Sequence, residues 1–333
     1  MKLRRAVGNL GAVNVGSSAS KPRKYIYIDV LRGLALLAMA IYHLSWDLSW
    51  FQVVPWNVST GEGWRLFARL IASSFLFLVG FSLTLAHANA IRWRPFFKRE
   101  VKIVAAAVLV SIVTYFAFGE HMVRFGILHN IALTSLLAVF LVTVPLWVCG
   151  AGVVGAACLS LYVMGLEPSP WFYWIGIGGV GRPSVDFVPL LPWGTVVFAG
   201  VLVARILERF NLMRLFKGRG QPSALTRVAA WSGRHSLPIY LLHQPVLYGS
   251  VWALLQLGLI TDPPEKQFQK SCVQACSGQS EANLCESICR CTLEDMKGSG
   301  LWSAFKENPV NPSVTAKVQH SYRYCEKGSE TSP

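Results

Sequence analysis

Charged residues are scarce in this chain, and acidic residues are the scarcest of them. Only 14% of the 333 residues are charged, whereas soluble domains contain about 25%. Hydrophobic residues make up 53% of the sequence, and 17 Asp and Glu stand against 31 Lys and Arg. This composition excludes an ordinary soluble domain and predicts a membrane protein.

Polar interruptions are too few to break up seven long apolar stretches. Each stretch can cross about 30 Å of hydrocarbon as a helix. We therefore expect an all-α fold, a polytopic transmembrane helix bundle with about seven spans. The expected spans are residues 26–46, 67–88, 101–118, 125–144, 146–164, 187–207 and 237–259.

Cysteine is nearly absent from the apolar part, and apolar density falls sharply after residue 260. Three regions are expected: a basic cytoplasmic leader (1–24), a membrane domain (25–260) and a separate extracytoplasmic cysteine-rich tail (261–333). The sequence shows no convincing internal repeat. A G-x-G-x-x-G run at 176–181 lacks the strand and helix that a dinucleotide site requires.

The basic residues gather on one side of the expected membrane. They fill the leader and the loops near residues 92–102 and 205–234. The positive-inside rule therefore places the leader in the cytoplasm and the tail outside. The net charge of +14 belongs to the leader and the membrane domain and favours the lipid bilayer as partner. No readout motif accompanies it, so no nucleic-acid partner is expected.

Six cysteines in the tail predict a disulfide framework. Cys272 and Cys276, and likewise Cys285 and Cys289, are spaced to share a helix face. A helical hairpin would join 272 to 289 and 276 to 285, and Cys291 could pair with Cys325. Six cysteines allow fifteen pairings. An outer location favours disulfides, whereas a cytoplasmic tail would favour zinc; we expect no metal.

The first apolar stretch carries four ionisable residues that fall within about 60° on one helix face: Asp29, Arg32, His43 and Asp47. Ionisable groups in a bilayer are costly and mark functional sites by default. Histidine can take a proton from a hydroxyl or amine near neutral pH, and Asp47, one turn on, would orient it. Arg32, beside Asp29, offers donors for a phosphate or acyl oxygen.

A plainer alternative treats Asp29 and Arg32 as an ion pair at one interface, with His43 and Asp47 in water at the other. Further candidates are His129, as a second base, and His243, which with Pro245 interrupts the last span and either binds substrate or forms a structural polar knot. Arg65 and Arg69 could meet an anionic acceptor or only lipid headgroups.

Four segments resemble the catalytic region of heparan-α-glucosaminide N-acetyltransferase as found in similar bacterial membrane proteins. The spacing from Arg32 to His43 also resembles the acyltransferase-3 family. The lysosomal enzyme has asparagine at the place of His43 and its active histidine in the next loop, where residues 48–64 here contain none. The matching segments are 27–35 with Met39 and His43, 125–129, 186–193 and 236–245.

The resemblance implies transmembrane acyl transfer in a bacterial inner membrane. Acyl-CoA, such as acetyl-CoA, would serve as co-substrate rather than as a permanently bound cofactor. The acceptor would be a hydroxyl or amine of a sugar-containing or envelope molecule on the outer side, and a homo-oligomer is possible. The rival interpretation is a transporter or permease whose polar stripe lines a substrate or proton path.

Overall fold

The computed structural model describes residues 25–330, except positions 52, 55, 57, 59–60, 89, 170, 179–183, 217–220, 261–263, 278–281 and 310. The leader and the predicted start of the tail lie outside the described residues. The all-α prediction is confirmed, because the described residues contain 12 α-helices and no strand. Their only β feature is an isolated bridge between Phe125 and Phe187.

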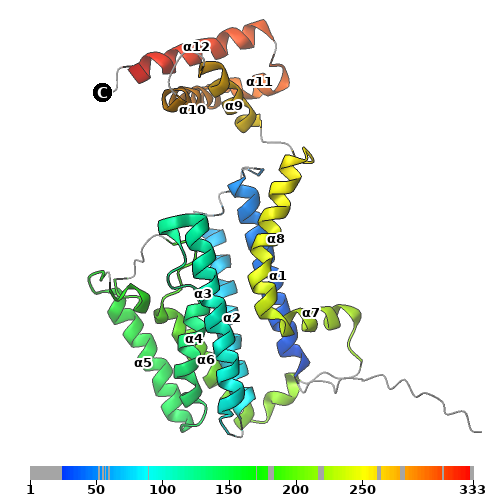
Figure 1. Cartoon of the computed structure of the whole chain (residues 1–333), viewed down its shortest axis with the longest axis vertical. Coiled ribbons are helices and arrows are strands. Elements are labelled where there is room, and N and C mark those ends of the chain that lie inside the picture. The colour runs from blue at the N-terminus through cyan, green and yellow to red at the C-terminus, as the bar shows by residue number, and fades with distance from the viewer. Residues whose placement is uncertain are drawn as a thin grey trace, which may run out of the picture.

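Seven α-helices lie where the seven apolar spans were expected (Figure 1). Five of them, α1, α2, α3, α5 and α6, are long and apolar enough to cross a membrane. The α4 helix is shorter, and α8 contains Pro245. The chain is a multi-pass membrane protein. The bounds are α1 (Ile26–Trp50), α2 (Glu62–His87), α3 (Trp93–Phe118), α4 (Ile127–Leu141), α5 (Leu146–Met164), α6 (Leu190–Arg209) and α8 (Ser236–Gln256).

Two predicted basic loops are largely helical. The α3 helix begins at Trp93, eight residues before the expected residue 101, so Arg99 and Lys102 project from the helix itself. The segment after α6 contains α7 (Ala224–Arg234), whose first turn is capped by a hydrogen bond from the Thr226 N–H to the Ser223 hydroxyl. Helices α1 and α3 begin at the end of the bundle where α7 lies. We call this end the basic end.

The bundle packs through two close helix crossings. At the basic end, α7 crosses α1 where Gly33 lies against the Ala229 carbonyl and Gly233 lies against the Asp29 carbonyl. A Cβ at either glycine would overlap that backbone oxygen. The α2 and α6 helices meet in the same way at Gly80 and Gly200. Small residues permit such close backbone approach in membranes, where packing drives helix association.

The C-terminal tail folds into four helices, α9 (Pro264–Cys276), α10 (Ala282–Gly298), α11 (Leu301–Glu307) and α12 (Pro312–Glu330), beyond the end of α8 (Figure 1). The α9 and α10 helices form the predicted hairpin. The sulfurs lie at disulfide distance in the three predicted pairs: Cys272 with Cys289 (1.96 Å), Cys276 with Cys285 (2.00 Å) and Cys291 with Cys325 (1.93 Å). A small apolar core containing Met296 and Trp302 supports these pairs.

Candidate functional site

The polar face of α1 is directed into the protein. Asp29 is 4% exposed and Asp47 is fully buried, although both lie on a helix whose other faces carry large exposed apolar side chains. Arg32 forms an ion pair with Asp29 at 3.5 Å, as the plainer alternative expected for these two residues. The polar stripe therefore points toward neighbouring helices rather than toward lipid.

A cavity of about 830 Å³ opens beside the Asp29–Arg32 pair, at the basic end of the bundle. Helices α1, α2, α3, α4 and α8 and the last residue of α7 line it. Apolar side chains such as Ile103, Leu128 and Ile131 form much of its wall. Its size is typical of a small-molecule or cofactor site.

Positive charge dominates the lining of this cavity. Asp29 is the only carboxylate that lines it among the described residues, whereas five lining side chains are cationic. Arginine side chains bind phosphate and carboxylate groups with paired donors. The cavity therefore favours an anionic ligand. The five cationic residues are Arg32, Arg92, Arg99, Lys102 and Arg234.

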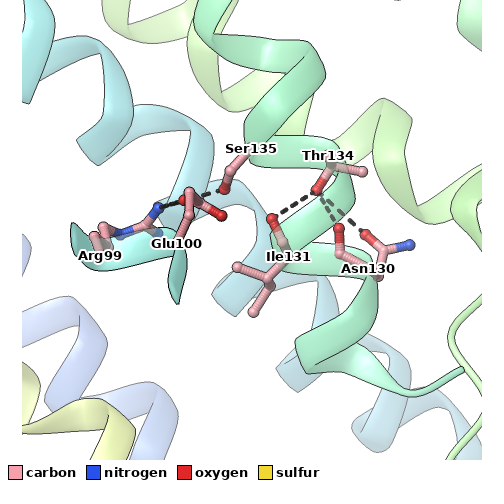
Figure 2. A network of polar contacts seen from close by, with 6 residues as sticks. All are labelled: Arg99, Glu100, Asn130, Ile131, Thr134 and Ser135. Atoms are coloured by element: carbon pink, nitrogen blue, oxygen red, sulfur yellow. Dashed lines mark hydrogen bonds and ion pairs between the residues drawn. The ribbon is translucent and has the colours of Figure 1, made fainter. Parts of the chain in front are cut away.

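A polar network holds Arg99 in place (Figure 2). Its Nη1 lies 2.7 Å from Oε1 of the buried Glu100 and donates a longer hydrogen bond of 3.4 Å to the Ser135 hydroxyl on α4. At the preceding residue of α4, the Thr134 hydroxyl donates to the carbonyl oxygen of Asn130 at 2.6 Å. The bond from Arg99 to Ser135 joins α3 to α4 and holds the guanidinium beside the cavity.

The four predicted stripe residues do not share one cavity. Asp29 and Arg32 line the basic cavity, whereas His43 and Asp47 are absent from its lining. His43 instead packs against His243 of α8, with ring centroids 4.8 Å apart and ring planes inclined at 66°. Folding thus brings together two histidines that are 200 positions apart in the chain.

The contacts of His243 define which of its nitrogens carries the proton. Its Nδ1 lies 2.6 Å from the carbonyl oxygen of Tyr240. A carbonyl only accepts hydrogen bonds, so Nδ1 carries the proton and Nε2 of the neutral ring keeps a lone pair. This Nε2 is buried and has no hydrogen-bond partner among the described residues. It can therefore accept a proton or a hydrogen bond.

Asp47 is engaged with α8. Gln244 donates a hydrogen bond from Nε2 to Asp47 Oδ1 at 2.8 Å. The orientation of His43 by Asp47 remains a prediction, since the hydrogen bond that the structure gives Asp47 leads to Gln244. The pairs His43–His243 and Asp47–Gln244 together form one polar seam between α1 and α8.

His129 lies outside this seam. It accepts a hydrogen bond on Nδ1 from the Gly126 N–H at 3.3 Å, and its Nε2 lies 3.4 Å from the Ser111 hydroxyl on α3. Both ring nitrogens are therefore occupied at the start of α4. This geometry suits a histidine that joins two helices, and its role as a second base stays a prediction.

The predicted acceptor residues Arg65 and Arg69 are exposed near the start of α2 and do not line the cavity. Sequence reasoning missed Arg99 and Arg234 as cavity residues and Tyr240 as the partner of His243. The adjacent charges Arg99 and Glu100, directly before an apolar span, were the available signal for the first. The others depend on helix packing, which no local pattern encodes.

One comparison with known proteins is informative. The family model described as heparan-alpha-glucosaminide N-acetyltransferase, catalytic, matches residues 24–245. No curated protein and no solved structure showed significant similarity to the chain. The match spans α1 to the middle of α8 and includes both the basic cavity and the polar seam. The chain therefore belongs to the family of the heparan-alpha-glucosaminide N-acetyltransferase catalytic domain.

Proposed function

We propose that this protein transfers an acyl group, in the simplest case acetyl, from acyl-CoA to a hydroxyl or amine on the other side of the membrane. The acceptor is a sugar-containing or envelope molecule. Family membership supports a membrane acetyltransferase. The observation that carries the choice of donor is the cationic cavity at the basic end.

The cavity chemistry matches coenzyme A. Coenzyme A carries several phosphates on a nucleotide and a long, mostly uncharged arm that ends in sulfur. Arg32, Arg99 and the other cationic side chains would bind the phosphates. The apolar wall of the cavity would contact the uncharged arm of coenzyme A. Asp29 would hold Arg32 in position.

The polar seam lies farther along α1 and α8, the helices that carry Arg32 and Tyr240. His43 follows Arg32 by eleven residues, which is about 16 Å along a helix. His243 follows Tyr240, a cavity residue, by one helical turn. This spacing supports a donor that binds at the basic end and delivers its acyl carbon toward the histidines.

The proposed step conserves atoms and charge. His43 takes the proton from the acceptor hydroxyl or amine while the acceptor oxygen or nitrogen bonds to the acyl carbon. The carbon–sulfur bond then breaks, and the departing sulfur receives the proton, which gives the free thiol of coenzyme A. Asp47, His129, Arg65, Arg69 and His243 are the further residues that the sequence associates with catalysis and acceptor binding.

The charge distribution supports a location and an orientation. We place the protein in a bacterial inner membrane with its basic end in the cytoplasm and its tail in the periplasm. Acyl-CoA is a cytoplasmic metabolite, so this orientation presents the cationic cavity to its donor. Reporter fusions after α2 and after α8 should give cytoplasmic and periplasmic signals, respectively; the opposite pattern contradicts the orientation.

Purified protein in lipid nanodiscs, supplied with acetyl-CoA and a panel of amino sugars and glycans, tests the function. We expect thiol release that depends on an acceptor, and a loss of about 10²- to 10⁴-fold in His43→Ala. His320→Ala, at an exposed tail histidine, is the matched control. Protein that binds acetyl-CoA but never cleaves it over this panel supports the transporter interpretation instead.

A further inference from the structure

We infer that His243 on α8, rather than Asp47, is the residue that positions His43 for proton transfer. This inference rests on the proposed function and assigns a role within the same site. It starts from the contacts of the two residues that could support the His43 ring: the carboxylate one turn along α1 and the imidazole on α8.

The Asp47 carboxylate serves a different contact. It is fully buried and accepts the hydrogen bond from Gln244 at 2.8 Å, which ties α1 to α8. Its Oδ2 is buried and has no hydrogen-bond partner among the described residues, so neither oxygen of Asp47 is hydrogen-bonded to His43. The ring of His43 is instead in contact with the ring of His243.

The ring of His243 is prepared to accept a hydrogen bond. The Tyr240 carbonyl accepts a hydrogen bond from Nδ1 of His243, which keeps the proton on that nitrogen and fixes the orientation of the ring. The Nε2 lone pair is buried and has no partner in the described part of the chain. A buried polar atom without a partner is costly, and such an atom calls for a functional or solvent explanation.

The ring contact places a donor close to this lone pair. With ring centroids 4.8 Å apart, a turn of the half-buried His43 ring about its side-chain bond brings one N–H of His43 onto Nε2 of His243. The other nitrogen of His43 then presents its lone pair to the acceptor. This is the role that an acceptor behind a catalytic histidine plays in nucleophile activation.

Every proton in this step has a donor and an acceptor. The acceptor hydroxyl or amine gives its proton to the outward nitrogen of His43, and the other N–H of His43 stays hydrogen-bonded to, or moves onto, Nε2 of His243. The added positive charge is then shared between two imidazoles and the Tyr240 carbonyl. When the thioester breaks, the proton leaves through the outward nitrogen of His43 to the sulfur.

Two substitutions at one position separate positioning from packing. In His243→Asn the amide nitrogen replaces Nδ1 as donor to Tyr240, but no acceptor remains at the Nε2 position. In His243→Gln the amide oxygen reaches the Nε2 position and can still accept from His43. We expect kcat to fall about 10- to 100-fold in His243→Asn, with KM for acetyl-CoA unchanged, and to recover in large part in His243→Gln.

His235→Asn is the matched control, because His235 also contacts a backbone carbonyl, that of Trp231, at 2.9 Å, but is exposed and outside the site. It should retain the wild-type kcat. Equal kcat in wild type and His243→Asn overturns the inference, as does an equal loss in the Asn and Gln variants, since a packing role does not distinguish them. Acceptor-dependent turnover of the wild type tests the proposed function separately.

A spectroscopic measurement tests the inference even when the acceptor panel contains no substrate of the protein. Nitrogen-15 NMR of histidine-labelled protein in nanodiscs distinguishes protonated from unprotonated ring nitrogens. The signal that disappears in His243→Asn should show a proton on Nδ1 and none on Nε2. A proton on Nε2 of His243 would remove the acceptor and overturn the inference.

Discussion

Gln244 on α8 donates a hydrogen bond to the buried carboxylate of Asp47 on α1 at 2.8 Å, across 197 positions of sequence. The bond lies one residue beyond His243 and one helical turn beyond His43, so it fixes the register in which the two histidine rings meet. In a bilayer, no bulk water can replace the lost partner of a buried polar group. The hydrogen bond therefore contributes both to stability and to the geometry of the site.

Gln244→Ala should destabilise the membrane domain by about 1–3 kcal/mol, because it leaves the Asp47 carboxylate buried without its donor. The midpoint of thermal unfolding in a mild detergent measures the change. Gln256→Ala, on the last turn of the same helix and exposed, should leave the midpoint unchanged. Equal midpoints for wild type and Gln244→Ala would mean that the bond does not stabilise the native state.

Arg32→Gln and Arg99→Gln should each raise KM for acetyl-CoA by about 10- to 100-fold, because each removes a charged donor worth about 1.5–3 kcal/mol from the phosphate site. Steady-state thiol release measures KM. Arg209→Gln is the control, because Arg209 is exposed at the basic end and does not line the cavity. A comparable rise in that variant would indicate a general effect of surface charge.

Gly33→Ala should weaken the packing of α7 on α1, because the new Cβ would overlap the backbone carbonyl of Ala229. Overpacking of this kind costs about 1–3 kcal/mol. Gly249→Ala, where a Cβ meets no atom within 4 Å, should be neutral or slightly stabilising. Proteolysis of the segment around α7 reports the difference, and equal cleavage rates in the two variants would contradict the close crossing.

The tail should contain three disulfides when the protein is isolated without reductant. Denatured but unreduced protein should then alkylate at two cysteines, Cys149 and Cys158, and reduced protein at all eight. Peptide mass spectrometry should recover the three linked pairs. Six alkylated tail cysteines before reduction would instead indicate free thiols.

Loss of the Cys276–Cys285 pair by a double substitution to serine should destabilise the tail by about 2–5 kcal/mol, as is typical of a small domain that loses a native disulfide. Hydrogen exchange of α9 and α10 measures this effect. Cys158→Ser, at an exposed and unpaired cysteine, is the control. Unchanged exchange in the double variant would show that the α9–α10 hairpin is stable without this link.

Local pattern was sufficient for most of the secondary structure. The seven apolar stretches became helices α1 to α6 and α8, because apolar length alone sets where a chain can span a bilayer. The i, i+4 spacing of the tail cysteines predicted a helical hairpin, since the pitch of a helix fixes which sulfurs share a face. The proposed pairing was one of fifteen, and the three pairs of the structure agree with it. Arg32 and Asp29 formed the expected ion pair for the same reason.

The errors occurred where charge and helix propensity compete. Basic residues at 94–102 and 224–234 were assigned to loops, yet they lie on α3 and α7. Polar composition does not prevent a helix when its other faces pack, and α7 packs against α1 through Gly33 and Gly233.

The sequence by itself determined that the chain is a helical membrane protein, that His43 lies on the face of Asp29 and Arg32, and that Cys272 shares a helix face with Cys276, as Cys285 does with Cys289. These properties depend on neighbours a few residues apart. Only the tertiary structure decided that His43 meets His243, that Asp47 binds Gln244, and that Arg99 and Arg234 line one cavity with Arg32. Those contacts depend on how separate helices pack, and packing is a property of the whole bundle rather than of any one segment.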